Sequence, residues 1–226
     1  MFSQNTLFSL VALFFAAQPA LGQILINGQI FTGALSIVDS PAPQSTLHAG
    51  STTGIAIDIS GDGHLDQAAS TPNSGLATSF DSLEIYLVSY ETKLNLTVSQ
   101  GPGLLTQETG STVKHLNWLI DTCVPSGDYN LTFYEGSHID KQPYFTITPL
   151  PIAIQNTQQS GDCSNGTNTL QSFPQAQSPP AHSPWLNGNE TAVSFPSTTA
   201  SSAITTLSIH IFAALISIIS LSSLAF

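Results

Sequence analysis

Arginine is absent from this 226-residue sequence, and lysine supplies all three of its basic side chains, against 14 Asp and Glu. The formal net charge is −11, so the chain offers no basic surface for the phosphates of a nucleic acid. Charged residues of either sign make up only 8% of the chain. We therefore expect hydroxyl and amide side chains, together with attached sugars, to keep the protein in solution.

Cysteine is also scarce, since only Cys123 and Cys163 occur. Two soft ligands are too few for a structural metal site. In an oxidising compartment an even pair of cysteines usually forms one disulfide. We expect this bond to close a loop of about 40 residues and to attach the start of the following tail to the domain.

Both ends of the sequence are apolar. Residues 1–22 carry no charge and include an apolar run over 7–17, which is typical of a secretory signal peptide. Residues 207–226 form a second apolar run, without the basic flank that normally holds a spanning helix on its cytoplasmic side. Small residues around Ser197 and a polar spacer precede this run, as in a signal for a glycosylphosphatidylinositol (GPI) anchor. We expect attachment at Ser197, with 200–202 as the alternative site and a single spanning helix as the alternative to an anchor.

Between these ends, short apolar runs with period-two alternation are separated by clusters of Gly, Pro, Asn and Ser, a pattern that predicts antiparallel strands. The predicted strands are 31–38, 54–60, 83–90, 93–99, 112–120, 129–135 and 144–154. Their number favours an all-β sandwich of two sheets. We expect a signal peptide at 1–22, a sandwich domain at 23–155, a disordered Ser/Thr/Pro-rich stalk at 156–197 and an anchor signal at 198–226. The stalk is too polar to offset its chain entropy by burial.

Four N-glycosylation sequons begin at Asn95, Asn130, Asn165 and Asn189, and each is an acceptor in a secreted chain. Asn95 and Asn130 alternate with apolar residues inside predicted strands. Since alternate residues of a strand point to opposite faces, we expect their side chains to face solvent and their neighbours to face the core.

Three motifs could carry chemistry. Asp58, Asp62 and Asp66 follow the spacing of a calcium loop, but the twelfth position is Ala69 instead of Glu, and a polar hairpin loop is the alternative. Ser, His and Asp within 137–140 are too close in sequence to assemble a catalytic triad. An S-x-x-K pattern at 111–114 lies in a predicted strand and lacks its companion motifs. A copper site of the monooxygenase type needs a histidine at the mature amino terminus, where we expect Gln23. We therefore predict no catalytic residue, no cofactor and no enzymatic activity.

Tyr86, Tyr90 and Tyr134 fall on the outward faces of their predicted strands. Flat aromatic rings can stack on pyranose rings at little entropic cost. The three tyrosines are therefore candidates for glycan binding, and the alternative is that they are exposed side chains of a sandwich without a ligand.

Several short segments carry a family resemblance. They are SIVDSP at 36–41, LHAG at 47–50, Trp118, PSGDYNLTF at 125–133 and YFTI at 144–147. Together they resemble the immunoglobulin-like domain of the fungal KRE/KNH-type cell-wall synthesis family, which occurs in many Ser/Thr-rich GPI-anchored proteins. Asp58 and the long loop over 61–80 depart from the family pattern.

The resemblance implies an immunoglobulin-like, non-catalytic sandwich held at the fungal cell surface. We expect a structural or adhesive role there, with wall polysaccharide or a surface protein as partner and the membrane contacted through the anchor. A carbohydrate-binding module and, further off, a copper- or calcium-binding surface protein are the alternatives.

Overall fold

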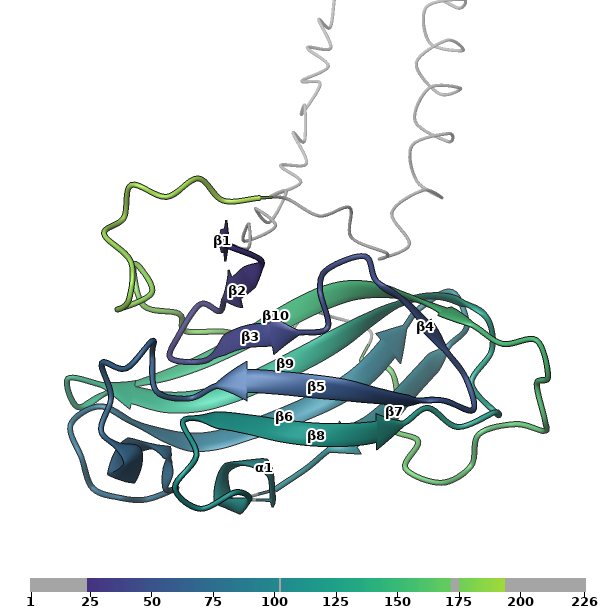
Figure 1. Cartoon of the computed structure of the whole chain (residues 1–226), viewed down its shortest axis with the longest axis horizontal. Helices are drawn as coiled ribbons and strands as arrows, with labels where there is room; N and C mark the ends of the chain where they lie inside the picture. Colours follow the sequence, from purple (N-terminus) through teal and green to yellow (C-terminus); the bar gives the residue numbers. More distant parts are fainter. Residues whose placement is uncertain (1–23, 102, 172–174, 194–226) are drawn as a thin grey trace, which may run out of the picture.

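The computed structural model describes residues 24–101, 103–171 and 175–193 (Figure 1). The predicted signal peptide and the predicted anchor signal with Ser197 lie outside these residues.

Two five-stranded sheets stack face to face, with sheet 1 in front of sheet 2 in Figure 1. Sheet 1 has the order β1 (Ile24–Ile26), β2 (Gln29–Phe31), β3 (Ile37–Ser40), β5 (Thr52–Asp58), β8 (Val113–Leu119). Sheet 2 has the order β4 (Thr46–His48), β10 (Gln142–Gln155), β9 (Gly127–Ile139), β6 (Ser79–Ser89), β7 (Leu94–Ser99). All neighbouring strands are antiparallel except β4 and β10, which are parallel. The predicted all-β sandwich is confirmed; a 3₁₀ turn (Gln67–Ser70) and the short α1 (Gly103–Thr106) are the helical elements that the described residues contain.

The predicted alternation places the core correctly. Leu83, Ile85 and Leu87 of β6 are fully buried between the sheets, and Tyr129, Leu131 and Phe133 of β9 lie beside them. Sheet 1 contributes Ile55 and Ile57 of β5, Trp118 of β8 and Ile120. These side chains form one continuous apolar cluster.

One predicted strand is wrong. The segment 31–38 is divided into β2 and β3 by a loop at 32–36, because a buried carboxylate from the facing sheet binds that loop. Glu135 of β9 has an exposed fraction of 0%. Its Oε1 accepts a hydrogen bond from the Leu35 amide at 2.8 Å, and its Oε2 accepts from the Ser36 amide at 3.1 Å and the Ser36 hydroxyl at 2.6 Å. The Thr32 hydroxyl also lies 3.3 Å from Oε2. Charge-assisted bonds of this kind are among the stronger hydrogen bonds in proteins.

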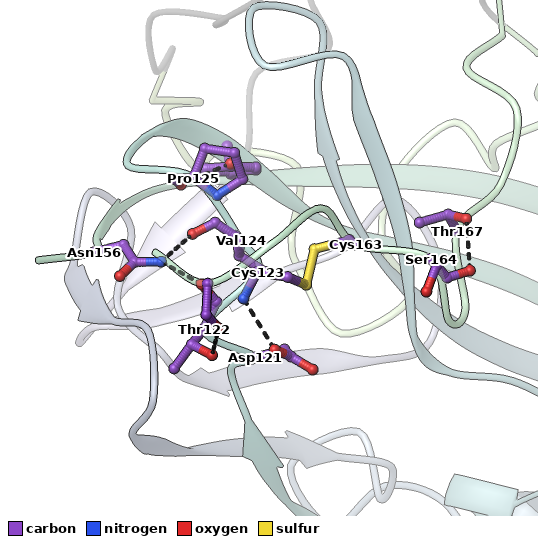
Figure 2. The surroundings of a disulfide bond; sticks show 11 residues. Asp121, Thr122, Cys123, Val124, Pro125, Asn156, Cys163, Ser164 and Thr167 are labelled. Atoms are coloured by element: carbon purple, nitrogen blue, oxygen red, sulfur yellow. Dashed lines mark hydrogen bonds between the residues drawn. A yellow bond between two sulfur atoms is a disulfide. The ribbon is translucent and has the colours of Figure 1, made fainter. Parts of the chain in front are cut away.

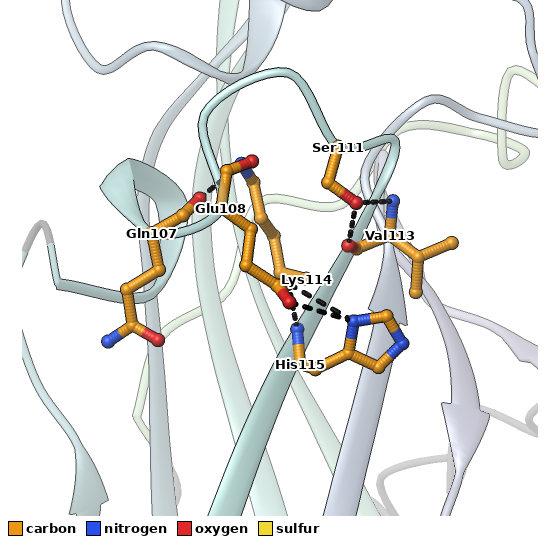
Figure 3. Close-up of polar contacts among 6 residues, drawn as sticks. All are labelled: Gln107, Glu108, Ser111, Val113, Lys114 and His115. Atoms are coloured by element: carbon orange, nitrogen blue, oxygen red, sulfur yellow. Dashed lines mark hydrogen bonds and ion pairs between the residues drawn. The ribbon is translucent and has the colours of Figure 1, made fainter.

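A second charged side chain is buried in the other sheet. Lys114 of β8 has an exposed fraction of 2%, and its Nζ donates to the carbonyl oxygens of Gln107 at 2.6 Å and Glu108 at 3.1 Å (Figure 3). Lys114 therefore binds the backbone that follows α1. Ser111 bonds to the backbone of Val113 instead, so the S-x-x-K pattern does not bring its Ser and Lys together.

The predicted disulfide is confirmed. Cys123 and Cys163 are bonded, with a Cα–Cα distance of 5.0 Å (Figure 2). Beside the bond, the Asn156 side-chain amide donates to the carbonyl oxygens of Thr122 at 2.7 Å and Val124 at 2.8 Å. The chain that leaves β10 is therefore fixed to the β8–β9 connection from its first residues onward.

Candidate functional site

Residues 156–171 and 175–193, here called the tail, do not form a free stalk. Beyond Cys163 the tail pairs with the outer edge of β7, where the Thr97 amide donates to the Gly166 carbonyl at 2.8 Å and the Asn168 amide donates to the Asn95 carbonyl at 2.7 Å. At the opposite side of sheet 2, the Ser178 amide donates to the Phe145 carbonyl of β10 at 2.9 Å. The prediction of a disordered segment is therefore wrong for these residues. Their stabilisation comes from backbone groups of two sheet edges and from the disulfide, which composition does not reveal.

Trp185 fastens the far part of the tail to the sandwich. Its Nε1 donates to the Leu35 carbonyl at 2.7 Å, and its ring stacks on His64 with a centroid distance of 5.8 Å. Gly61 approaches this ring so closely that a Cβ atom at Gly61 would lie 2.5 Å from it. Since Gly61 also has a φ of +59°, both the contact and the backbone favour glycine at this position.

A groove of about 340 Å³ lies between the tail and the outer face of sheet 2. Strands β6, β9 and β10 contribute aromatic side chains to it, and the tail contributes amides. The lining residues are Ser82, Glu84, Tyr86, Asn95, Tyr134, Phe145, Asn168, Thr169, Gln171 and Gln175. Its volume is at the lower end of the range for small-molecule sites.

The aromatic floor of the groove is a chain of three rings. Tyr86 and Tyr134 meet edge to face with centroids 5.3 Å apart, and Tyr134 lies 6.2 Å from Phe145. The Tyr86 hydroxyl donates to Glu84 Oε2 at 2.8 Å, and Glu84 Oε1 accepts from the Gly101 amide at 3.3 Å. The rings are therefore held in place by strand register and by hydrogen bonds.

Ionisation of the groove tyrosines is suppressed. Burial and the hydrogen bond to Glu84 raise the pKa of Tyr86 to about 12, and burial raises the pKa of Tyr134. Both phenols are therefore neutral at physiological pH and keep their hydrogen-bond donors.

Besides Ser82, Glu84 and Thr169, the polar lining of the groove consists of neutral amides. Asn95 Oδ1 is buried and has no hydrogen-bond partner among the described residues, while Asn168, Gln171 and Gln175 add further amide groups from the tail. An aromatic floor facing amide donors and acceptors matches the chemistry of a sugar, which has an apolar ring face and a rim of hydroxyls.

The predicted tyrosine platform is thus only partly brought together. Tyr86 and Tyr134 line the groove, whereas Tyr90 lies outside it and donates its hydroxyl to the Gln171 carbonyl at 3.0 Å. Sequence reasoning missed Phe145 and the tail amides. Phe145 could have been found from the alternation in β10, but the tail amides could not, because their segment was predicted to be free.

The candidate calcium ligands are not gathered around a common point. Asp58 Oδ1 accepts from the amide and hydroxyl of Ser60, and Asp58 Oδ2 accepts from the Asp62 amide at 3.1 Å. No group of three His, Cys, Asp or Glu side chains suited to a metal occurs in the part of the chain that the structure describes. The weak candidate set of Asp58, Asp62 and Asp66 therefore lies in a polar loop closed by its own first carboxylate. This loop is not the hairpin that was the alternative, because the flanking strands β5 and β6 belong to different sheets.

The Ser, His and Asp of 137–140 are also dispersed. Ser137 is fully buried, and His138 Nδ1 contacts Asp81 Oδ2 at 2.6 Å. His115 contacts Glu108 at 3.1 Å (Figure 3).

The four sequons differ sharply in exposure. Asn165 and Asn189 are exposed and Asn95 is half-buried, whereas Asn130 is only 8% exposed. The predicted facing of Asn130, opposite to Leu131, is right, but the expectation that it reaches solvent is wrong. It lies in the middle of sheet 2, with Val88 and Pro151 directly across from it on the adjacent strands. Glycosylation of each sequon stays a prediction.

Among residues 24–101, 103–171 and 175–193, no helix has the length and apolar character needed to cross a membrane. No model of a known protein family matches the chain, and no curated protein sequence matches it.

Proposed function

We propose that this protein is a non-catalytic glycoprotein of the fungal cell surface, tethered by a GPI anchor, whose immunoglobulin-like sandwich has an adhesive role and binds wall polysaccharide in the groove. The observation that carries the proposal is the groove itself, in which Tyr86, Tyr134 and Phe145 form an aromatic floor opposite amide side chains. The acidic, arginine-free composition fits a neutral ligand better than a polyanion.

The proposed location at the cell surface rests on the sequence. The apolar run at 7–17, the small residues around Ser197 and the apolar run at 207–226 support secretion and anchor addition. The two stacked sheets are compatible with an immunoglobulin-like domain, and the short motifs at 36–41 and 125–133 support the link to the KRE/KNH-type family.

The binding proposal is tested with the purified protein on a panel of insoluble β-glucan, chitin and mannan. We expect retention on at least one polymer and a loss of at least tenfold in affinity for Tyr86→Ala and for Tyr134→Ala. Tyr144→Ala is the matched control, because Tyr144 is a half-buried tyrosine of β10 outside the groove. Failure to bind any polymer, or equal losses in all three variants, would overturn the groove as a sugar site.

The anchor is tested separately on intact cells. Phosphatidylinositol-specific phospholipase C should release the protein, and mass spectrometry of the released carboxy terminus should find a truncated chain ending near Ser197. Retention on cells from which a known GPI-anchored control is released argues for a spanning helix or for covalent transfer to wall glucan.

A further inference from the structure

The sequon at Asn95 lies against the tail, and the tail engages both of its functional groups. The Asn95 side-chain amide, which is the atom that N-glycosylation modifies, donates to the Thr169 carbonyl at 3.2 Å. The hydroxyl of Thr97, the third residue of the sequon, accepts from the Asn168 side-chain amide at 3.0 Å. In the docked chain the tail therefore occupies one N–H of the Asn95 amide and an acceptor site of the Thr97 hydroxyl.

The same part of the tail also pairs with the backbone of the sequon. Leu96 pairs with Thr167 in an antiparallel bridge, flanked by the amide–carbonyl bonds from Thr97 to Gly166 and from Asn168 to Asn95. The tail thus lies beside the sequon as an added edge strand. A transferase that needs to enclose an extended acceptor segment cannot reach a segment that is already paired.

An N-glycan on Asn95 also needs space beside the docked tail. The Asn95 side chain lines the groove, its Oδ1 is buried, and its Nδ2 faces the backbone of Thr169. An N-glycan is a bulky, hydrated branch that starts at this nitrogen and needs a path to solvent. Thr169 lies against this nitrogen, so we expect a glycan at Asn95 to crowd Thr169 and to displace the tail from β7.

We propose that N-glycosylation of Asn95 and docking of tail residues 163–171 on β7 exclude each other, so that the protein exists in a docked form and a glycosylated, tail-released form. This inference rests on the proposed function as a secreted glycoprotein. Glycans at Asn165 or Asn189 do not have this effect, because both side chains are exposed.

The choice between the forms is made during synthesis. Asn95 enters the secretory compartment about 70 residues ahead of Cys163, which corresponds to roughly 4–14 s at about 5–20 residues per second. The tail cannot protect the sequon during that interval. Once the Cys123–Cys163 bond has formed, it fixes the chain just before Gly166, whose carbonyl accepts from Thr97 of β7, and so favours docking in every chain that is still unmodified.

The lining of the groove differs between the docked form and the tail-released form. Asn168, Thr169 and Gln171 are part of its wall only when the tail is docked. The released form keeps the aromatic floor but loses these amides, so it binds a groove ligand more weakly.

The test uses the full chain secreted from a eukaryotic host, with glycopeptide mass spectrometry at all four sequons and hydrogen exchange of tail peptides. Chains that carry sugar at Asn95 should exchange the Asn168 amide at least tenfold faster than chains without it. Chains that differ only in glycosylation at Asn189 are the matched control, and their Asn168 amides should exchange at equal rates. Two variants that weaken docking, Asn168→Ala and Cys123→Ser with Cys163→Ser, should raise occupancy at Asn95 and leave it unchanged at Asn189.

Equal protection of the tail with and without sugar at Asn95 overturns the inference, and so does unchanged occupancy at Asn95 in both variants. Asn168→Ala keeps this readout valid if the disulfide variant does not fold, because Asn168 is exposed. The absence of sugar from all four sequons contradicts the proposed secreted glycoprotein itself, which distinguishes that failure from failure of the inference alone.

Discussion

Replacement of the buried carboxylate Glu135 by glutamine tests how the two sheets are held together. Glutamine has nearly the same shape, but one of its two terminal atoms donates instead of accepting. Glu135 accepts from the Leu35 amide and the Ser36 amide through different oxygens, so either orientation of the new amide points an NH₂ group at a backbone N–H. When the NH₂ group replaces Oε2, the hydroxyls of Ser36 and Thr32 can rotate to accept from it, but in neither orientation can the opposing backbone N–H accept.

The expected loss follows from these contacts. A hydrogen bond to a charged group contributes about 1.5–3 kcal/mol, and a buried donor left without an acceptor costs about 1–3 kcal/mol. Glutamine offsets part of this loss, because a neutral group is less costly to bury than a carboxylate. We expect Glu135→Gln to lower the free energy of unfolding by about 3 kcal/mol. Glu135→Ala should lower it by about 4–5 kcal/mol, since both amides are then orphaned beside a cavity.

Urea unfolding followed by far-UV circular dichroism measures the effect as a shift of the midpoint at constant m value. Glu84→Gln is the matched control. Glu84 is a half-buried carboxylate of the adjacent strand that accepts one backbone bond at 3.3 Å, and its replacement should cost less than about 1 kcal/mol. A Glu135→Gln protein as stable as the wild type would refute the reasoning, because it would mean that the carboxylate contributes nothing beyond its shape.

Three further predictions concern the disulfide, the groove and the buried lysine. Replacing Cys123 and Cys163 by serine should cost about 4 kcal/mol in urea unfolding, the chain-entropy value for a separation of 40 residues; a loss below about 1 kcal/mol would show that the tail is held by its other contacts. In an alkaline absorbance titration Tyr86 should ionise at about pH 12, and Glu84→Gln should lower that midpoint. Because the folded pKa exceeds the unfolded value, the stabilisation from Tyr86 is complete below pH 10 and is lost between pH 10 and 12. Burial lowers the pKa of Lys114, so wild-type stability should rise relative to Lys114→Met as pH increases from the folded pKa to 10.5; parallel pH profiles would contradict the burial of a charged lysine.

The sandwich was predictable because its physical cause is local. Period-two alternation in segments such as 83–90 and 129–135 indicates which side chains point inward. Ile85 and Leu131 are buried in the structure, as that pattern predicts. The disulfide was predictable because two cysteines allow one pairing. In both cases the sequence alone leaves few alternatives.

The tail was not predictable because its contacts are made by backbone atoms and by single side chains far away in sequence. Trp185 is one aromatic residue in a polar segment, and its acceptor, the Leu35 carbonyl, is 150 residues distant. The average composition of the segment therefore gives no sign that this single side chain binds the sandwich. Two of the three rings on the floor of the groove, Tyr86 and Tyr134, were predicted, whereas the part of its lining that comes from the tail required the three-dimensional structure.

The loop at 32–36 connects these two parts of the molecule. Its amides at Leu35 and Ser36 face inward to Glu135, while its carbonyl at Leu35 faces outward to Trp185 and its carbonyl at Ala34 accepts from the Ser183 hydroxyl at 3.4 Å. A peptide group whose donor is fixed by a carboxylate presents its neighbouring acceptors in a fixed direction. The buried charge therefore orients the acceptor on which the tail is fastened, so loss of Glu135 should loosen Trp185 as well as the sheets. The core of the sandwich and the far part of the tail are coupled through this loop.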